Sequence, residues 1–276
     1  DKGPRLDAAE EVEAADWFDQ SKQPVVISAE DGIQLHGWLF DPDCAGAKPH
    51  LYAICCHGYS GQPQDMAKYA HRFARLGFTV LVPALRGHGL SEGRYAGMGW
   101  LDRRDLMRWI SLIIDSDADA RILLQGKSMG AAAVMMTVGE PDLPRNVVAA
   151  VEDCGYASVG QQFIDCARSM FHLPKFLAKP IVTTMGAIAR RRAGYGFQEA
   201  SCVEQLKHAT IPMLFIHGGA DDFVPSRALD ENFDACASID RQKLLIPSAG
   251  HSMSASTAPV VYWKTVTNFV TRVFGL

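Results

Sequence analysis

A serine between two glycines joins an apolar run to an alanine-rich run. The motif Gly-Lys-Ser-Met-Gly spans residues 126–130, directly after the apolar residues 122–125 and directly before residues 131–136, Ala-Ala-Ala-Val-Met-Met. A serine on a tight strand-to-helix turn is exposed to attack a substrate, and the helix N-terminus beyond it favours developing negative charge. The pattern therefore predicts a nucleophile at Ser128. The competing interpretation is an ordinary turn whose serine caps a helix.

The base and the acid that such a serine needs both follow it along the chain. His251 lies between small residues after the last apolar run, and Asp221 and Asp222 lie in a polar segment after the run before it. Triads of one common topology have the chain order serine, acid, histidine. We therefore expect His251 to take the serine proton and Asp221 to orient the imidazole. Asp222 and Asp153 are the alternative acids.

Two backbone amides are expected to face the oxygen that becomes negative when Ser128 attacks a carbonyl group. One belongs to Met129, the residue after the nucleophile, and the other to a loop after an early strand. In residues 55–61, Cys-Cys-His-Gly-Tyr-Ser-Gly, the amide of Tyr59 fits this role best. His57 precedes the serine in the chain, so we interpret it as a brace for this loop rather than as the base.

Other kinds of site are disfavoured by particular residues. The end of residues 126–128 resembles a phosphate-binding loop, but Arg121 stands where that loop needs glycine, and residues 122–125 have the pattern of a buried strand. The seven cysteines have no metal-ligand spacing and are interpreted as free, mostly buried thiols, so we expect no metal. No motif predicts a cofactor. The basic run 190–192 is expected to be a solvated face.

Composition restricts the class of protein further. The chain has 276 residues, of which 48% are hydrophobic and 21% charged, which is typical of a globular protein with a large core. Its net charge of −4 provides no basic footprint for nucleic acid. No stretch approaches about 18 consecutive apolar residues, so the chain as given is expected to be soluble. Oligomeric state is left open.

The periodicity of apolar residues predicts an α/β fold with a mostly parallel sheet. Helical patterns alternate with short apolar runs after an initial hairpin, as in βα units that place helices on both faces of a sheet. No long linker or repeat divides the chain. The expected strands are 25–28, 35–40, 51–56, 79–83, 122–125, 147–152, 213–216 and 243–246, and the expected helices are 5–20, 65–76, 101–115, 128–139 and 260–274.

Taken together, these motifs resemble those of bacterial α/β-hydrolases, a group of serine hydrolases related to esterases and often described as membrane-anchored or cell-surface enzymes. The resemblance covers nearly the whole chain from about residue 25. In the family pattern His-Gly-x-x-Asp-x-x-Val-Pro the acid falls on Asp221, and Lys127 departs from the usual apolar or small residue. The matching segments are 57–61, 86–93, 126–130, 152–156, 221–225 and 250–253.

The resemblance implies a single α/β-hydrolase domain, residues 1–276, with an eight-stranded sheet and no cofactor. It implies a serine hydrolase acting on a small-molecule ester, with thioesters or small peptides as alternative substrates, because a triad does not distinguish leaving groups. A hydrolase-like binding protein without turnover is the alternative from another class. The location is either that of an exported or membrane-anchored ectodomain or the cytoplasm.

Residues 157–210 contain no strand-like run and are interpreted as a helical cap inserted over the strand ends. Prolines and glycines are expected to divide the segment into short helical pieces. Its apolar residues predict an apolar underside that lines a pocket for short or medium acyl chains. These residues are Phe163, Met170, Phe171, Leu173, Phe176, Leu177, Ile181, Met185, Tyr195 and Phe197.

Overall fold

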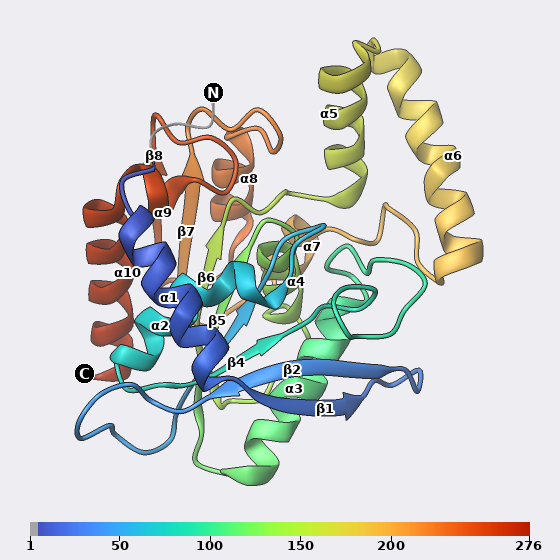
Figure 1. Cartoon of the computed structure of the whole chain (residues 1–276). Coiled ribbons are helices and arrows are strands. Elements are labelled where there is room, and N and C mark those ends of the chain that lie inside the picture. The colour runs from blue at the N-terminus through green and yellow to red at the C-terminus, as the bar shows by residue number, and fades with distance from the viewer. Residues whose placement is uncertain (1–4) are drawn as a thin grey trace.

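Eight segments pair into one twisted sheet in the computed structural model, which describes residues 5–276 (Figure 1). The strand order is β1-β2-β4-β3-β5-β6-β7-β8, and only the β1–β2 and β2–β4 pairs are antiparallel. The prediction of an α/β fold with a mostly parallel eight-stranded sheet is confirmed, as is the hairpin at its edge. The strands are β1 (Gln23–Ser28), β2 (Gln34–Phe40), β3 (Leu51–Cys56), β4 (Thr79–Pro83), β5 (Arg121–Lys127), β6 (Val147–Asp153), β7 (Met213–Gly218) and β8 (Arg241–Ile246).

Helices cover both faces of this sheet, and each face has its own apolar core. In β3 successive side chains alternate, so Ile54 packs with the core under α3 and α4, whereas Ala53 and Cys55 pack with the core under α2 and α10. Within residues 5–276, none of the helices is both long and apolar enough to traverse a bilayer. The helices are α1 (Ala8–Ser21), α2 (Ala67–Arg75), α3 (Asp102–Ser116), α4 (Met129–Thr137), α5 (Val159–Phe171), α6 (Lys175–Ala193), α7 (Cys202–Leu206), α8 (Arg227–Ala235), α9 (Ser254–Thr257) and α10 (Pro259–Phe274), with a 3₁₀ turn at Pro63–Met66.

Between β6 and β7 the chain leaves the sheet and forms α5, α6 and α7. Ser158 and Ser201, which directly precede α5 and α7, form an isolated antiparallel bridge. Each serine also caps a helix, because Ser158 Oγ accepts from the amide of Gln161 and Ser201 Oγ from that of Glu204. Helices α5 and α6 form a hairpin that stands away from the sheet, at the upper right of Figure 1.

The expectation that prolines and glycines divide this segment into short pieces is wrong for α6, which continues through Pro180 and Gly186. Pro180 removes one helical hydrogen bond to the carbonyl of Phe176, on an exposed turn where water can satisfy that carbonyl. Gly186 faces Phe197, whose ring and backbone would lie 3.4 Å from an added Cβ. A methyl group would make ordinary van der Waals contact at this distance, so Gly186 is packed inside the helix and does not break it.

A buried arginine ties the loop after β4 to α3. Arg86 donates through Nε and Nη2 to the two carboxylate oxygens of Asp105, at 2.6 and 2.7 Å, and through Nη1 to Asp31 at 2.9 Å. Arg86 and Asp105 are both buried. A buried bidentate pair costs much free energy to break, because removal of one partner leaves the other charge without compensation.

The substitution Arg86→Met should therefore lower the free energy of unfolding by about 3–5 kcal/mol, measured by urea denaturation. The matched control is Arg272→Met, since Arg272 forms the same bidentate geometry with Asp240 on the surface, at 2.7 and 2.8 Å. That exposed pair should contribute less than about 1 kcal/mol. Equal losses in the two variants would contradict the importance of burial.

Candidate active site

Ser128 lies at the turn between β5 and α4, in a backbone conformation that few residues other than glycine adopt. Its φ is 56° and its ψ −117°, and such strained geometry costs on the order of 1–3 kcal/mol. The turn can be this tight because its neighbours are glycines. A Cβ on Gly126 would lie 2.3 Å from the carbonyl oxygen of Gly130, and one on Gly130 would lie 2.2 Å from that of Cys56.

The side chain of Ser128 begins a chain of hydrogen bonds through residues from three separate loops. Ser128 Oγ lies 2.8 Å from Nε2 of His251, and Nδ1 of His251 lies 2.7 Å from Oδ2 of Asp221. Because an ionised carboxylate only accepts, Nδ1 carries the proton and Nε2 is free to accept from the serine hydroxyl. The structure thus brings together the three residues that the sequence analysis selected.

The two alternative acids lie outside this chain. Asp222 is exposed and lines the opening beside Ser128. Asp153 is fully buried at the end of β6, and neither of its carboxylate oxygens has a hydrogen-bond partner within residues 5–276. Asp221 alone among the three is bonded to His251.

Asp221 is held in its charged form by groups on both sides. Its Oδ1 accepts from the amides of Phe223 and Val224, at 3.0 and 2.8 Å. Burial favours the neutral acid, but hydrogen bonds from His217 and His251 outweigh it and lower the pKa of Asp221 to about 2. The carboxylate therefore stays ionised at neutral pH and can stabilise a positive charge on His251.

His217 is a residue of this site that the sequence analysis missed. Its fully buried ring places Nε2 3.0 Å from the carbonyl oxygen of Val224 and 3.4 Å from Oδ2 of Asp221. Burial opposes a charge on this ring, but Asp221 outweighs burial and raises the pKa of His217 to about 9. The sequence does carry a signal for His217: it lies at the end of a predicted buried strand, four residues before Asp221.

Two further acids lie behind the triad at the end of β6. Burial raises the pKa of Glu152 to about 8, so this side chain is mostly neutral at pH 7. Its Oε2 accepts from the amide of Gly155 at 3.0 Å. Burial also raises the pKa of Asp153. At neutral pH Glu152 is therefore mostly neutral, whereas Asp221, the acid in contact with His251, is ionised.

The loop after β3 brings a second backbone amide toward Ser128. A Cβ on Gly58 would lie 3.2 Å from the Cβ of Ser128, so this loop touches the nucleophile. Among the hydrogen bonds of residues 5–276, none is donated by the amide of Tyr59 or Met129. Both predicted amides are thus available to a ligand.

His57 holds this loop in place, as the sequence analysis expected. Its Nε2 accepts from the amide of Leu85 at 3.1 Å, so its Nδ1 carries the proton and donates to the carbonyl oxygen of Gly58 at 2.8 Å. Burial lowers the pKa of His57 to about 4, which keeps the ring neutral at pH 7. The ring therefore links the loops after β3 and β4.

Ser128 opens into a cavity of about 590 Å³. Lys127 lines it, with Nζ 5.8 Å from the ring centroid of Tyr69, and the ring of Phe223 lies 5.0 Å from that of His251. No residue of 157–210, all of which the structure describes, lines this cavity. The prediction that residues 157–210 line the pocket with an apolar underside is therefore wrong. Met170, Phe171 and Phe176 face solvent instead.

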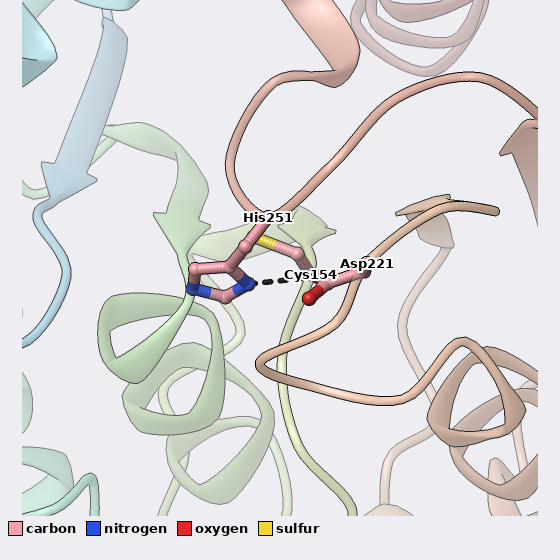
Figure 2. Close-up of side chains that lie close together, drawn as sticks. All are labelled: Cys154, Asp221 and His251. Carbon is pink, nitrogen blue, oxygen red and sulfur yellow. Dashed lines mark hydrogen bonds and ion pairs between the residues drawn. The ribbon is translucent and has the colours of Figure 1, made fainter. Parts of the chain in front are cut away.

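Within residues 5–276, one group of side chains has atoms close enough together to be considered as a metal site, and one of its members is a buried thiol. Figure 2 shows Cys154 beside Asp221 and His251, whose candidate ligand atoms all lie within 4.8 Å of one another. Burial and the charge of Asp153 raise the pKa of the Cys154 thiol, and a metal would need the thiolate. The Asp221 and His251 atoms are already bonded to each other, so the set fits a proton relay better than a metal.

Comparison with known proteins assigns the chain to a family. A model of the family "Serine aminopeptidase, S33" matches residues 47–185. The uncharacterized protein YqkD of Bacillus subtilis is 26% identical over 255 residues, which cover 92% of this chain and 81% of YqkD. The uncharacterized protein Rv2307c of Mycobacterium tuberculosis is 29% identical over 230 residues, which cover 83% of this chain and 72% of Rv2307c.

Solved structures share the fold at lower identity. The Pyrococcus furiosus esterase Pf2001 superimposes with a TM-score of 0.72 at 20% identity, covering 91% of this chain and 92% of the esterase. An α/β serine hydrolase homologue from Coxiella burnetii has a TM-score of 0.62 at 17% identity, covering 89% of this chain and 96% of that one. Because the family model spans half of the chain, including Ser128, the protein belongs to the serine aminopeptidase S33 family of α/β-hydrolases and is a serine hydrolase.

Proposed function

We propose that the protein hydrolyses carboxylic esters of small or medium acyl or aromatic acids, with Ser128, His251 and Asp221 as its catalytic triad. The observation that carries this proposal is the hydrogen-bond chain from Ser128 Oγ through His251 to Asp221, at 2.8 and 2.7 Å. Serine, histidine and acid in this geometry act on acyl groups in several unrelated folds.

In the proposed reaction, Ser128 Oγ attacks the carbonyl carbon of the ester while Nε2 of His251 takes the hydroxyl proton. The carbonyl oxygen becomes negative and accepts from the amides of Tyr59 and Met129. The C–O bond to the alcohol then breaks, and His251 returns the proton to the leaving alcohol. Water, deprotonated by His251, releases the acid from the acyl-enzyme and restores Ser128.

The choice of ester over peptide is supported by the esterase Pf2001, which shares the fold. The family description names an aminopeptidase instead, and the exposed Asp222 at the cavity provides a carboxylate that could pair with an α-ammonium group. Hydrolysis of small peptides is therefore the second candidate, with thioesters as a third substrate class. Aminoacyl p-nitroanilides turned over faster than p-nitrophenyl esters would favour the peptidase.

Residues 157–210 belong, in this proposal, to the same single domain as the rest of the chain, as a helical insertion beside the site. The contacts of its base support this interpretation. Gln162 of α5 donates to the carbonyl oxygen of Phe223 at 2.8 Å, and Asp165 pairs with Arg227. The insertion is thus bonded to the segment that carries Asp221.

Replacement of the nucleophile should remove nearly all activity. Ser128→Ala loses only a hydroxyl group, so it should fold normally while kcat for p-nitrophenyl acetate falls on the order of 10⁵- to 10⁶-fold. A fluorophosphonate probe should label the wild-type protein and not the variant. Absence of label on folded wild-type protein would instead favour a binding protein without turnover.

The adjacent aspartates should differ strongly in their effect on turnover. Asp221→Asn keeps the shape of the acid but favours the wrong imidazole tautomer, which costs about 10⁴-fold in kcat in the triad template. Asp222→Asn, its matched control, should change kcat by less than about tenfold, because His251 is bonded to Asp221 and Asp222 is exposed at the cavity. The reverse ranking would transfer the role of acid to Asp222.

A series of p-nitrophenyl esters with increasing acyl length tests the substrate class. Each methylene that the cavity accepts should contribute at most about 0.8 kcal/mol, so kcat/KM should rise gradually. It should then fall beyond roughly eight to ten carbons, once the cavity is filled. Efficient cleavage of emulsified long-chain triglyceride would contradict a preference for short and medium chains.

A further inference from the structure

The turn between α5 and α6 exposes large apolar side chains at the end of the hairpin that is farthest from the sheet (Figure 1). The exposed fractions of Met170, Phe171 and Phe176 are 64%, 70% and 75%. Isolated apolar residues on a surface are ordinary, but a contiguous group marks an interaction site. We call Met170, Phe171, Phe176 and Leu177 the hairpin tip.

The tip continues into a stripe along α6. Leu177, Ile181, Met185 and Ile188 recur at intervals of four, four and three residues, so they share one side of the helix, and all four are exposed. The neighbouring side of α6 buries Ala178, Val182 and Gly186. Helix α6 therefore has a second apolar side that the packing against α5 does not use.

The charge of this hairpin is opposite to that of the rest of the protein. Residues 166–198 contain six lysines and arginines and no aspartate or glutamate, whereas the remainder of the chain carries a net charge of −10, since the whole chain carries −4. Arg168, Lys175 and Lys179 surround the tip. Within residues 5–276 none of these three forms an ion pair with an acidic residue.

We propose that the hairpin tip docks onto an anionic lipid bilayer. Aromatic and aliphatic side chains flanked by lysine and arginine are the composition of helices that lie in the interface of a membrane. The cations Lys175 and Lys179 flank Phe176, so they reach phosphate groups while the ring enters the acyl boundary. A second copy of the chain fits less well, because the charged side chains that flank the tip, Arg168, Lys175 and Lys179, are all positive and symmetric contacts would bring like charges together.

Docking at the tip leaves the reaction site outside the bilayer. Gln162, which is bonded to Phe223 of the active-site loop, precedes Phe171 by nine helical residues, or about 13 Å along α5. The hairpin tip therefore concentrates the protein at a membrane without changing the chemistry at Ser128. This inference is independent of which acyl bond Ser128 attacks.

Flotation with vesicles tests the proposal on the full chain. Vesicles of phosphatidylcholine with about 30% phosphatidylglycerol should carry the wild-type protein, and vesicles of phosphatidylcholine alone should not. Raising the salt from about 0.05 M to about 0.5 M should weaken the binding, because the headgroup attraction is screened. Absence of binding to the anionic vesicles at low salt would overturn the proposal.

Two double variants separate the contribution of the cations to vesicle binding from that of the aromatic side chains. Lys175→Gln with Lys179→Gln should weaken the partition coefficient by about 25-fold, or about fivefold for each cation. Phe171→Ser with Phe176→Ser should weaken it at least about tenfold. The matched controls are Arg145→Gln with Lys264→Gln and Ile239→Ser with Val260→Ser, which change exposed residues elsewhere and should bind like the wild type.

Folding and self-association are measured on the same variants. All four double variants should keep the thermal unfolding midpoint and the wild-type rate of soluble-ester hydrolysis, because each changes exposed side chains far from Ser128. Binding by the tip variants equal to that of their controls would overturn the proposal. A dimer in sedimentation velocity that the tip variants abolish, without vesicle binding, would assign the surface to a second copy instead.

Discussion

The active site depends on the close packing of three backbone segments. The N-terminus of α4, the end of β5 and the loop after β3 approach so closely that Gly126 and Gly130 have no room for a side chain. This crowding forces Ser128 to a positive φ and puts its hydroxyl group above the ends of the strands. Tyr59 of the loop after β3 lines the same cavity as Ser128, and within residues 5–276 the amides of Tyr59 and Met129 donate no hydrogen bond. A strained nucleophile and two free donors are thus consequences of one packing constraint.

Charge distribution behind the nucleophile follows from the order of the strands. Because β6 and β7 are neighbours, their carboxyl ends bring Glu152, Asp153 and His217 together beneath Asp221. Burial raises the pKa of both Glu152 and Asp153, whereas hydrogen bonds from His217, His251 and the amide of Val224 lower the pKa of Asp221. Low dielectric surroundings make such differences large. The low pKa of Asp221, the acid that faces His251, therefore results from its hydrogen-bond partners and not from its residue type.

Much of this arrangement was predictable because it is local in the sequence. Periodicity located all eight strands, and the order of Ser128, Asp221 and His251 after β5, β7 and β8 was enough to select them, since parallel strands end at the same edge. The preference for Asp221 over Asp222 is supported by the family pattern and by the bond between Asp221 and His251, because both acids lie in one loop. His217 was missed because a histidine inside an apolar strand looks like an ordinary core residue.

The position of the α5–α6 hairpin was not predictable in the same way. Its apolar residues suggested an underside, but periodicity only says that a helix has an apolar side and not what covers that side. Pro180 suggested a break, yet an exposed turn lets water replace the missing hydrogen bond. Long-range packing determines both outcomes, and neither is encoded within the segment.

The bridge between Ser158 and Ser201 has a consequence for how such a protein can change over time. The chain enters the α5–α6 hairpin at Ser158 and leaves it at Ser201, and these two bridged serines cap α5 and α7. A segment whose ends are pinned together can be lengthened, shortened or exchanged without moving β6 or β7, because the entropic cost of a longer closed loop grows only slowly with its length. Ser128, His251 and Asp221 all lie outside this segment. The insertion is therefore an exchangeable module, through which the protein can acquire a new location or partner while its chemistry stays the same.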